Sequence, residues 1–188
     1  MKLSYEIRVT DKNGKVIHRE KRVARSWVTN YNHLMYGAIF SDLVTLLDTS
    51  GVNRTPDKNN YGHFEMKAAA TTYTYGPVIG TDDTPVAMSN TKLGSQIVHG
   101  TGAGQMQYLA TAVPSPTVTA TTSSFTLTRQ YINVSGASIT VREIGIYGQA
   151  QSGGTRYVFC FARDVLGAPV TVPDGGAFTL IYTIAAVE

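Results

Sequence analysis

Cysteine and histidine, the usual zinc ligands of proteins, are scarce in this chain of 188 residues. Cys160 is the one cysteine, so it has no partner for an internal disulfide, and its place in the apolar run 157–161 predicts a buried, unreactive thiol. The four histidines lie far apart in the sequence, at His18, His33, His63 and His99. None has a second ligand at a coordinating offset, so we expect no zinc site.

Long apolar runs are also missing. No stretch approaches the roughly 18 uninterrupted apolar residues of a membrane-spanning helix. Residues 1–6 lack the apolar segment of a signal peptide. We therefore expect neither membrane insertion nor secretion.

Charged residues make up 15% of the chain and are unevenly placed, because half of the lysines and arginines lie in the first 25 residues. Glu20 interrupts this basic run, which alternates as a strand with one wet face does. The pattern favours a solvated or protein-binding face over nucleic-acid binding. We expect Lys15, Arg19 and Arg22 to contribute to a protein interface.

Most of the regular patterns in the sequence are those of β-strands. Apolar and β-branched residues alternate between turn signals over 138–184, which predicts three or four strands near 139–146, 157–161, 170–172 and 178–184. Further strands are expected at 3–10 and 15–23, joined by the Asn13-Gly14 turn, and at 105–113 and 117–134. Such closely spaced strands must pair antiparallel and bury one face.

One helix interrupts the strands. After Ser26, a good N-cap, apolar residues recur at helical spacing from Trp27 to Leu47, which predicts a long helix over about 27–47 packed on a sheet. Residues 48–105 are rich in small polar residues and are expected to form a loop-rich insertion or assembly arm, with 61–75 as a strand or extended arm. The whole predicts one mainly β domain over 1–188, an antiparallel sandwich or jelly-roll-like fold of about eight strands.

Few residues of the sequence form a pattern that is typical of a catalytic or metal-binding site. Asp82 and Asp83 could offer oxygen ligands to calcium, although an Asx turn explains them equally well. The glycine-rich stretch 100–105 lacks the third glycine and the following helix of a phosphate loop, so we interpret Thr101 and Gln105 as part of a contact loop. Glu143 lies inside a predicted strand, and we expect it to form a structural pair with Arg163 or Arg129. We predict no enzymatic activity, no cofactor and no metal.

Three segments resemble virion proteins of tailed bacteriophages. The first is Lys21-Arg22-Val23-Ala24-Arg25-Ser26-Trp27-Val28, a basic strand end followed by a helix start. The second is Ile139-Thr140-Val141-Arg142-Glu143-Ile144-Gly145-Ile146-Tyr147, which is similar to a strand of phage tail and tail-fibre proteins. The third joins Ala162-Arg163-Asp164-Val165-Leu166 to Val170-Thr171-Val172-Pro173-Asp174-Gly175. Residues 48–105 are not covered by the resemblance.

The resemblance implies a β-rich, non-enzymatic structural subunit of the tail, neck or capsid surface. We expect it to assemble in multiple copies through edge strands and loops. Its expected partners are copies of itself and other virion proteins, such as portal, tail or major capsid protein, and its expected location is the virion, after assembly in the host cytoplasm. Two alternatives remain. One is a glycan- or receptor-binding module of a phage tail that uses exposed aromatic residues such as Tyr73 and Tyr75, with Tyr108 or Trp27 as further candidates. The other is a virion hydrolase that uses Glu143.

Overall fold

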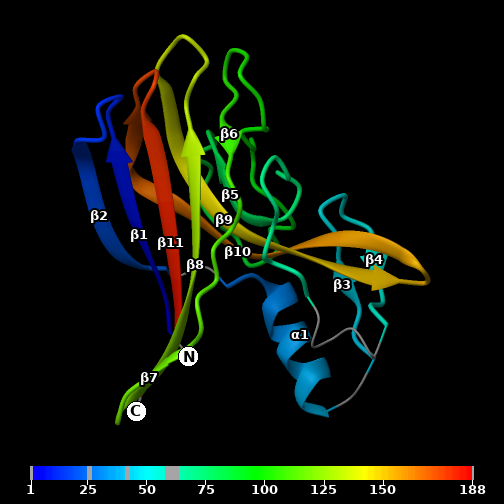
Figure 1. Cartoon of the computed structure of the whole chain (residues 1–188). Coiled ribbons are helices and arrows are strands. Elements are labelled where there is room, and N and C mark those ends of the chain that lie inside the picture. The colour runs from blue at the N-terminus through cyan, green and yellow to red at the C-terminus, as the bar shows by residue number, and fades with distance from the viewer. Residues whose placement is uncertain (1, 25–26, 41–42, 58–63, 188) are drawn as a thin grey trace.

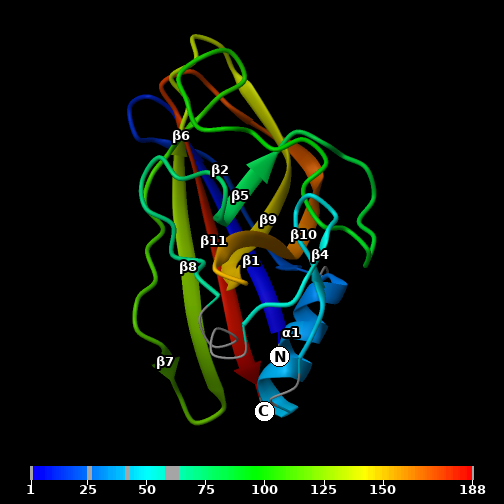
Figure 2. The same cartoon turned by 90° about the vertical axis from the view of Figure 1, so that its right-hand side faces the viewer.

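The computed structural model describes residues 2–24, 27–40, 43–57 and 64–187. Its strands form two main antiparallel sheets that lie against each other as in a sandwich (Figure 1 and, turned by 90°, Figure 2). Apolar side chains from both sheets, including Ile7, Leu180, Val141 and Ile146, form one buried core between them. The predicted mainly β, antiparallel fold is therefore confirmed.

The first sheet carries the N-terminal hairpin. Its strand order is β2 (Val16–Ala24), β1 (Lys2–Thr10), β11 (Ala177–Val187), β8 (Thr122–Ile132) and β6 (Gln107–Tyr108), and β7 (Thr117–Val118) also pairs with β8. The alternation in β1 places Tyr5, Ile7 and Val9 in the core. Strand β2 lies at the rim of this sheet.

The second sheet has the order β10 (Thr155–Val172), β9 (Ile139–Ser152) and β5 (Gly76–Gly80). Two sequence predictions are wrong here. The strands expected at 157–161 and 170–172 are parts of the single strand β10, whose register shifts between Cys160 and Ala162 and between Val165 and Val170. Strand β5 lies where a loop was expected, because pairing with β9 overrides the local signal of Gly76, Pro77 and Gly80.

The helix is shorter than predicted. Helix α1 spans Thr29–Phe40, and Leu46–Leu47 form the strand β3, which pairs with β4 (Asn53–Arg54). Trp27 lies before the helix and bridges to Ala162 of β10. The predicted N-cap Ser26 lies outside the described residues. Among the described segments, no helix is long and apolar enough to span a membrane.

The helix and the β3–β4 pair form a second, smaller cluster with the far part of the β9–β10 hairpin (Figure 1). Leu34 of α1 and Leu46 of β3 are buried in this cluster with Phe159 and Phe161 of β10. Asn30 joins the parts, because its amide donates to the carbonyl oxygens of Leu47 and Cys160 at 2.7 and 3.3 Å. The molecule thus has a sandwich core and a helix-covered hairpin core.

Candidate functional site

Glu143 is fully buried on β9, on the face covered by the segment 82–96. Its carboxylate accepts hydrogen bonds from the backbone amides of Asp82, Gly94 and Ser95 at 3.4, 3.0 and 2.8 Å. It also forms an ion pair with Arg163, whose Nε lies 2.8 Å from Oε2. Four donors therefore satisfy this carboxylate, which anchors the segment to the sheet.

Arg163 completes the anchor from the neighbouring strand β10. Its side chain is 2% exposed. One terminal nitrogen lies 2.8 Å from Oδ2 of Asp82 and 3.1 Å from the carbonyl oxygen of Thr84, and the other donates to Oδ1 of Asn90 at 3.2 Å. The structure thus brings together the predicted pair Glu143 and Arg163, and the pair holds a long loop against the second sheet.

Arg129, the other partner expected for Glu143, lies elsewhere. It is fully buried on β8 and donates to backbone carbonyl oxygens alone among the described residues. These acceptors belong to Ala69, Thr72, Tyr75, Pro77 and Leu109. Arg129 therefore fixes the segment 69–77 against the sandwich. Its register with the buried residues Leu127 and Tyr131 is a signal that could have placed it in the interior.

The acidic turn at Asp82 and Asp83 is engaged in ion pairs. Asp82 contacts Arg163, and its carboxylate also accepts from the backbone amide of Thr84 at 3.1 Å, as in an Asx turn. Asp83 lies 3.1 Å from Arg142. Within the described part of the chain, no three His, Cys, Asp or Glu residues gather in a way that could hold a metal ion. The contacts of Asp82 and Asp83 are those of a structural turn.

Cys160 lies in the interior, as its apolar surroundings predict. Burial raises the pKa of its thiol to about 12, so the thiol is neutral near neutral pH. Three of the histidines lie on separate elements: His18 on β2, His33 on α1, and His99 next to Tyr108, whose backbone amide donates to its Nδ1. His63 lies outside the described residues.

The predicted basic interface lies on the first hairpin. Lys15, Arg19 and Arg22 are all exposed. Arg19 pairs with Glu6 at 2.9 Å, whereas Arg22 pairs with Glu20 at 3.2 Å. Because side chains alternate along a strand, Arg19 and Arg22 point to opposite faces of β2. They therefore belong to two surfaces of this hairpin.

The predicted aromatic candidates are also separated. Tyr73 is 38% exposed and lines a cavity of about 360 Å³ together with Lys92, Gln96 and Thr74. Tyr75 is partly buried and packs against the sandwich core. Tyr108 is buried, and Trp27 stacks on Tyr31 with ring centroids 3.7 Å apart. Tyr73 is the one of these four rings that combines exposure with a cavity.

Thr101 and Gln105 lie in the same loop, as expected. The side-chain oxygen of Gln105 accepts from the backbone amide of Gly102 at 3.0 Å, so it closes the loop on itself. Thr101 is exposed and uncharged. The loop presents a small polar surface next to β6.

The three segments that carry the virion-protein resemblance meet at one place in the structure. Trp27 of the first segment bridges to Ala162 of the third, and the backbone amide of Val28 donates to the carbonyl oxygen of Phe161 at 3.0 Å. Glu143 of the second segment pairs with Arg163 of the third. No protein-family model, curated protein or solved structure matches this chain. The contacts between the three segments are therefore known for this chain and have no counterpart in a related protein with which they could be compared.

Both sheets end in an open rim at β2 and β10. Among the described residues no strand pairs with the outer side of β2. The outer side of β10 is partly covered, because it has a bridge at Ala162 and the carbonyl oxygens of Phe161 and Val158 accept from the backbone amides of Val28 and Thr49. Each rim is guarded against strand addition. On β2 charged side chains lie along the strand, and β10 carries Pro169 in the irregular stretch 166–169. Sequence patterns do not indicate which strand lies at a rim, so this surface was missed.

Proposed function

We propose that this chain is a non-enzymatic structural component of a tailed-phage virion, in the tail, the neck or on the capsid surface, which assembles in multiple copies. The observation that carries the proposal is the meeting of the three resembling segments around Trp27, Ala162, Glu143 and Arg163. Segments far apart in the sequence that resemble one class of protein and also touch in space form a single structural unit. Chance matches would be scattered over the fold.

The surfaces support an assembling subunit. Strand β2 exposes apolar side chains at the rim, with Val16, Ile17 and Val23 at 52%, 50% and 67% exposure. The loop around Thr101 and the β7–β8 region, where Val118 is exposed, add uncharged surface. Exposed apolar residues rimmed by charges are typical of protein-binding sites. When such contacts are repeated over many copies, the binding energies of individually weak interfaces together stabilise the assembly.

Purified particles test the proposal. Tailed particles from the strain that encodes the chain are banded on a density gradient, washed at high salt, and analysed by mass spectrometry with labelled standard peptides. We expect peptides of this chain in the particle band at several copies per particle. An abundant cytoplasmic host protein, which should be removed by the wash, serves as the control. Recovery of the chain in the soluble fraction alone would contradict the proposal.

The cavity beside Tyr73 favours one second candidate, a glycan-binding module. An exposed tyrosine ring offers a surface on which a sugar can stack, and Lys92, Gln96 and Thr74 place polar side chains around it. A glycan array tests this candidate. Binding should disappear on Tyr73→Ala and persist on Tyr75→Ala, whose ring packs on the core. An array without signal would remove the candidate.

A further inference from the structure

The cavity beside Tyr73, about 360 Å³ in volume, lies where three loops meet over the second sheet. We call it the Tyr73 cavity. The loops supply its polar lining, which consists of Thr49, Tyr73, Thr74, Lys92 and Gln96. The sheet contributes Tyr147 of β9 and Val158 of β10. Loops held by a rigid sheet commonly carry binding residues, and the volume is near the lower end of that of small-molecule sites.

One wall of the Tyr73 cavity is fixed by its backbone. Lys92 and Gln96 stand at the two ends of the stretch 93–95, whose three consecutive amides all donate to buried side chains. The acceptors are the hydroxyl oxygen of Tyr147 at 2.5 Å and the carboxylate of Glu143 at 3.0 and 2.8 Å. Both lining residues therefore extend from a backbone that is held in place.

The opposite wall, which carries Tyr73 and Thr74, is fixed in the same way. Arg129 donates to the carbonyl oxygens of the residues on either side of this pair. The side-chain amide of Gln96 donates to the carbonyl oxygen of Tyr73 at 2.5 Å, so the two walls are joined. Thr71 nearby has a φ of 69°, which is rare for a β-branched residue. Strained backbone of this kind is found mostly at functional sites.

The two buried charged anchors of the protein thus place the side chains of one cavity. Arg129 holds one wall, and Glu143 with its partner Arg163 holds the other. Burial of charged groups is costly, and a gain in stability does not by itself explain it. A site that is already ordered loses less conformational entropy when a ligand binds, so the anchors favour binding here.

The charge of the lining favours an anion. Among the described residues that line the Tyr73 cavity, Lys92 alone is charged. Lys92 is exposed, and none of the described ion pairs involves it. The carboxylates behind its segment, those of Glu143 and Asp82, are both paired with Arg163. One ammonium group therefore suits a ligand with one negative charge.

The uncharged part of the lining suits a ring that carries hydroxyl groups. The ring of Tyr73 is 38% exposed and offers a face on which a sugar can stack. Thr49 and Thr74 add hydroxyl groups, which can donate to and accept from the hydroxyls of a sugar. A phosphate is less well suited, because phosphate sites use free backbone amides and those of 93–95 are already bonded.

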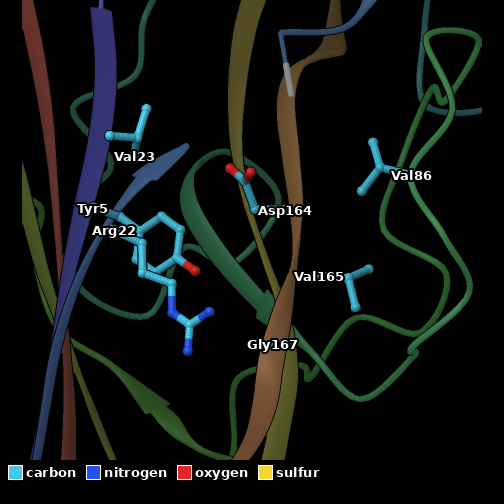
Figure 3. Close-up of a pocket in the computed structure, with 7 residues that line it drawn as sticks. All are labelled: Tyr5, Arg22, Val23, Val86, Asp164, Val165 and Gly167. Atoms are coloured by element: carbon cyan, nitrogen blue, oxygen red, sulfur yellow. The ribbon is translucent and has the colours of Figure 1, made fainter. Parts of the chain in front are cut away.

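A larger cavity, of about 570 Å³, lies between β2 and β10 (Figure 3). Figure 3 shows Tyr5 and Arg22 on one side of it and Asp164 on the other. Groups of both charge signs line this cavity, so its lining does not select a ligand of one sign. It serves here as the comparison for the Tyr73 cavity.

We propose that the Tyr73 cavity binds a carboxylated sugar, whose ring stacks on Tyr73 and whose carboxylate contacts Lys92. This inference rests on the glycan-binding candidate described above and names the class of sugar. Because Lys92 is exposed, the ion pair is screened by salt, and the affinity should fall as the salt concentration rises.

Titration of the full chain, followed by ligand-observed NMR, tests the proposal with matched pairs of sugars. The methyl glycosides of glucuronic and galacturonic acid are compared with those of glucose and galactose, and N-acetylneuraminic acid is compared with its methyl ester. Each pair differs in the charged carboxylate. We expect a carboxylated sugar to bind about fivefold more tightly than its neutral counterpart at low salt.

Two positions in the Tyr73 cavity separate the charge from the ring. Lys92→Ala should remove the preference for the carboxylated sugar and leave the affinity for the neutral one unchanged, whereas Lys92→Arg should keep the preference. Tyr73→Ala should abolish binding of both sugars, and Tyr73→Phe should retain it, because the ring remains. Both side chains are exposed, and the urea midpoint of each variant verifies that it is folded.

Matched controls exclude an effect of net charge and of the other cavity. Lys67→Ala removes another exposed lysine, and Arg22→Ala removes a cation from the cavity of Figure 3. Both should bind the sugars like the wild type. Loss of binding in Arg22→Ala but not in Lys92→Ala would place the ligand in the other cavity and overturn the proposal. Tighter binding of adenosine monophosphate than of every carboxylated sugar would also overturn it.

The outcomes distinguish this inference from the function on which it rests. If neutral sugars bind through Tyr73 and a carboxylate adds no affinity, the glycan-binding candidate stands and the inference fails. If no sugar binds, both fail. The particle experiment decides independently whether the chain is a virion component.

Discussion

The two buried arginines, Arg163 and Arg129, have different hydrogen-bond partners and hold different segments of the chain. Arg163 meets the carboxylates of Glu143 and Asp82, whereas Arg129 meets carbonyl oxygens and lies over the ring of Tyr108. Both hold segments without regular structure against the sheets. The polar interior of this protein thus organises its loops, and loss of a charge there should reduce stability.

The variant Glu143→Gln tests whether the buried ion pair on the second sheet stabilises the protein. The change keeps the shape of the side chain but leaves Arg163 with the single carboxylate of Asp82 and presents an amide to backbone donors. We expect the free energy of unfolding to fall by about 3 kcal/mol. Urea denaturation measures it. The exposed Glu65→Gln, which loses a pair with Arg156, should cost under about 1 kcal/mol, and equal losses would contradict the anchoring role.

The pKa of Cys160 predicts an alkaline loss of stability. The ordinary thiol pKa is 9.0 and the folded value is about 12, so between these pH values the unfolded chain has released a proton that the folded chain keeps. Stability therefore falls as pH rises through this window. Cys160→Ala should reduce the fall between about pH 8 and about pH 10.5 by about 2 kcal/mol. Identical pH slopes in denaturation would refute the shift.

At the scale of elements, strands formed by local alternation were predictable and those defined by distant partners were not. The hairpin of β1 and β2 follows its pattern and its Asn13-Gly14 turn, where Gly14 has a positive φ. The helix prediction failed because residue 27 pairs with β10 and Leu46–Leu47 pair with β4. The pair of Glu143 and Arg163 was predictable from charge. The loop it holds was not, because its amide donors lie 48 to 61 residues away.

The turn of the β9–β10 hairpin gives a prediction at this scale. Gly153 and Gly154 join Ser152 to Thr155 with φ of 56° and 84°, as in a type I′ turn. Gly154→Ala should cost about 1 kcal/mol, because a Cβ atom disfavours positive φ. Gly153→Asn should be nearly neutral, since asparagine tolerates this region. Thermal unfolding compares the two variants, and equal stability would contradict the turn assignment.

For the molecule as a whole, the two clusters of buried side chains should differ in cooperativity. The sandwich core joins both sheets, whereas the smaller cluster joins α1 and β3 to the far part of the hairpin. Local opening is expected where fewer apolar contacts hold the chain. The smaller cluster should therefore open without unfolding the sandwich.

Hydrogen exchange measures this difference. Leu34→Ala should speed amide exchange in α1 and β3–β4 while β1, β8 and β11 keep the wild-type rate. Leu180→Ala in the sandwich core should instead speed exchange in those strands and cost about 3 kcal/mol. Faster exchange throughout the chain in both variants would show one cooperative unit.

The guarded rims have a consequence for how the protein behaves when it is concentrated. Pro169 removes a backbone N–H donor from β10, and the charged side chains along β2 disfavour the approach of another strand. Fibril seeding from either rim is thereby suppressed even where neighbours are crowded. Replacement of Pro169 and of the charges on β2 by β-branched residues should therefore favour the addition of further strands at these edges and the growth of fibrils.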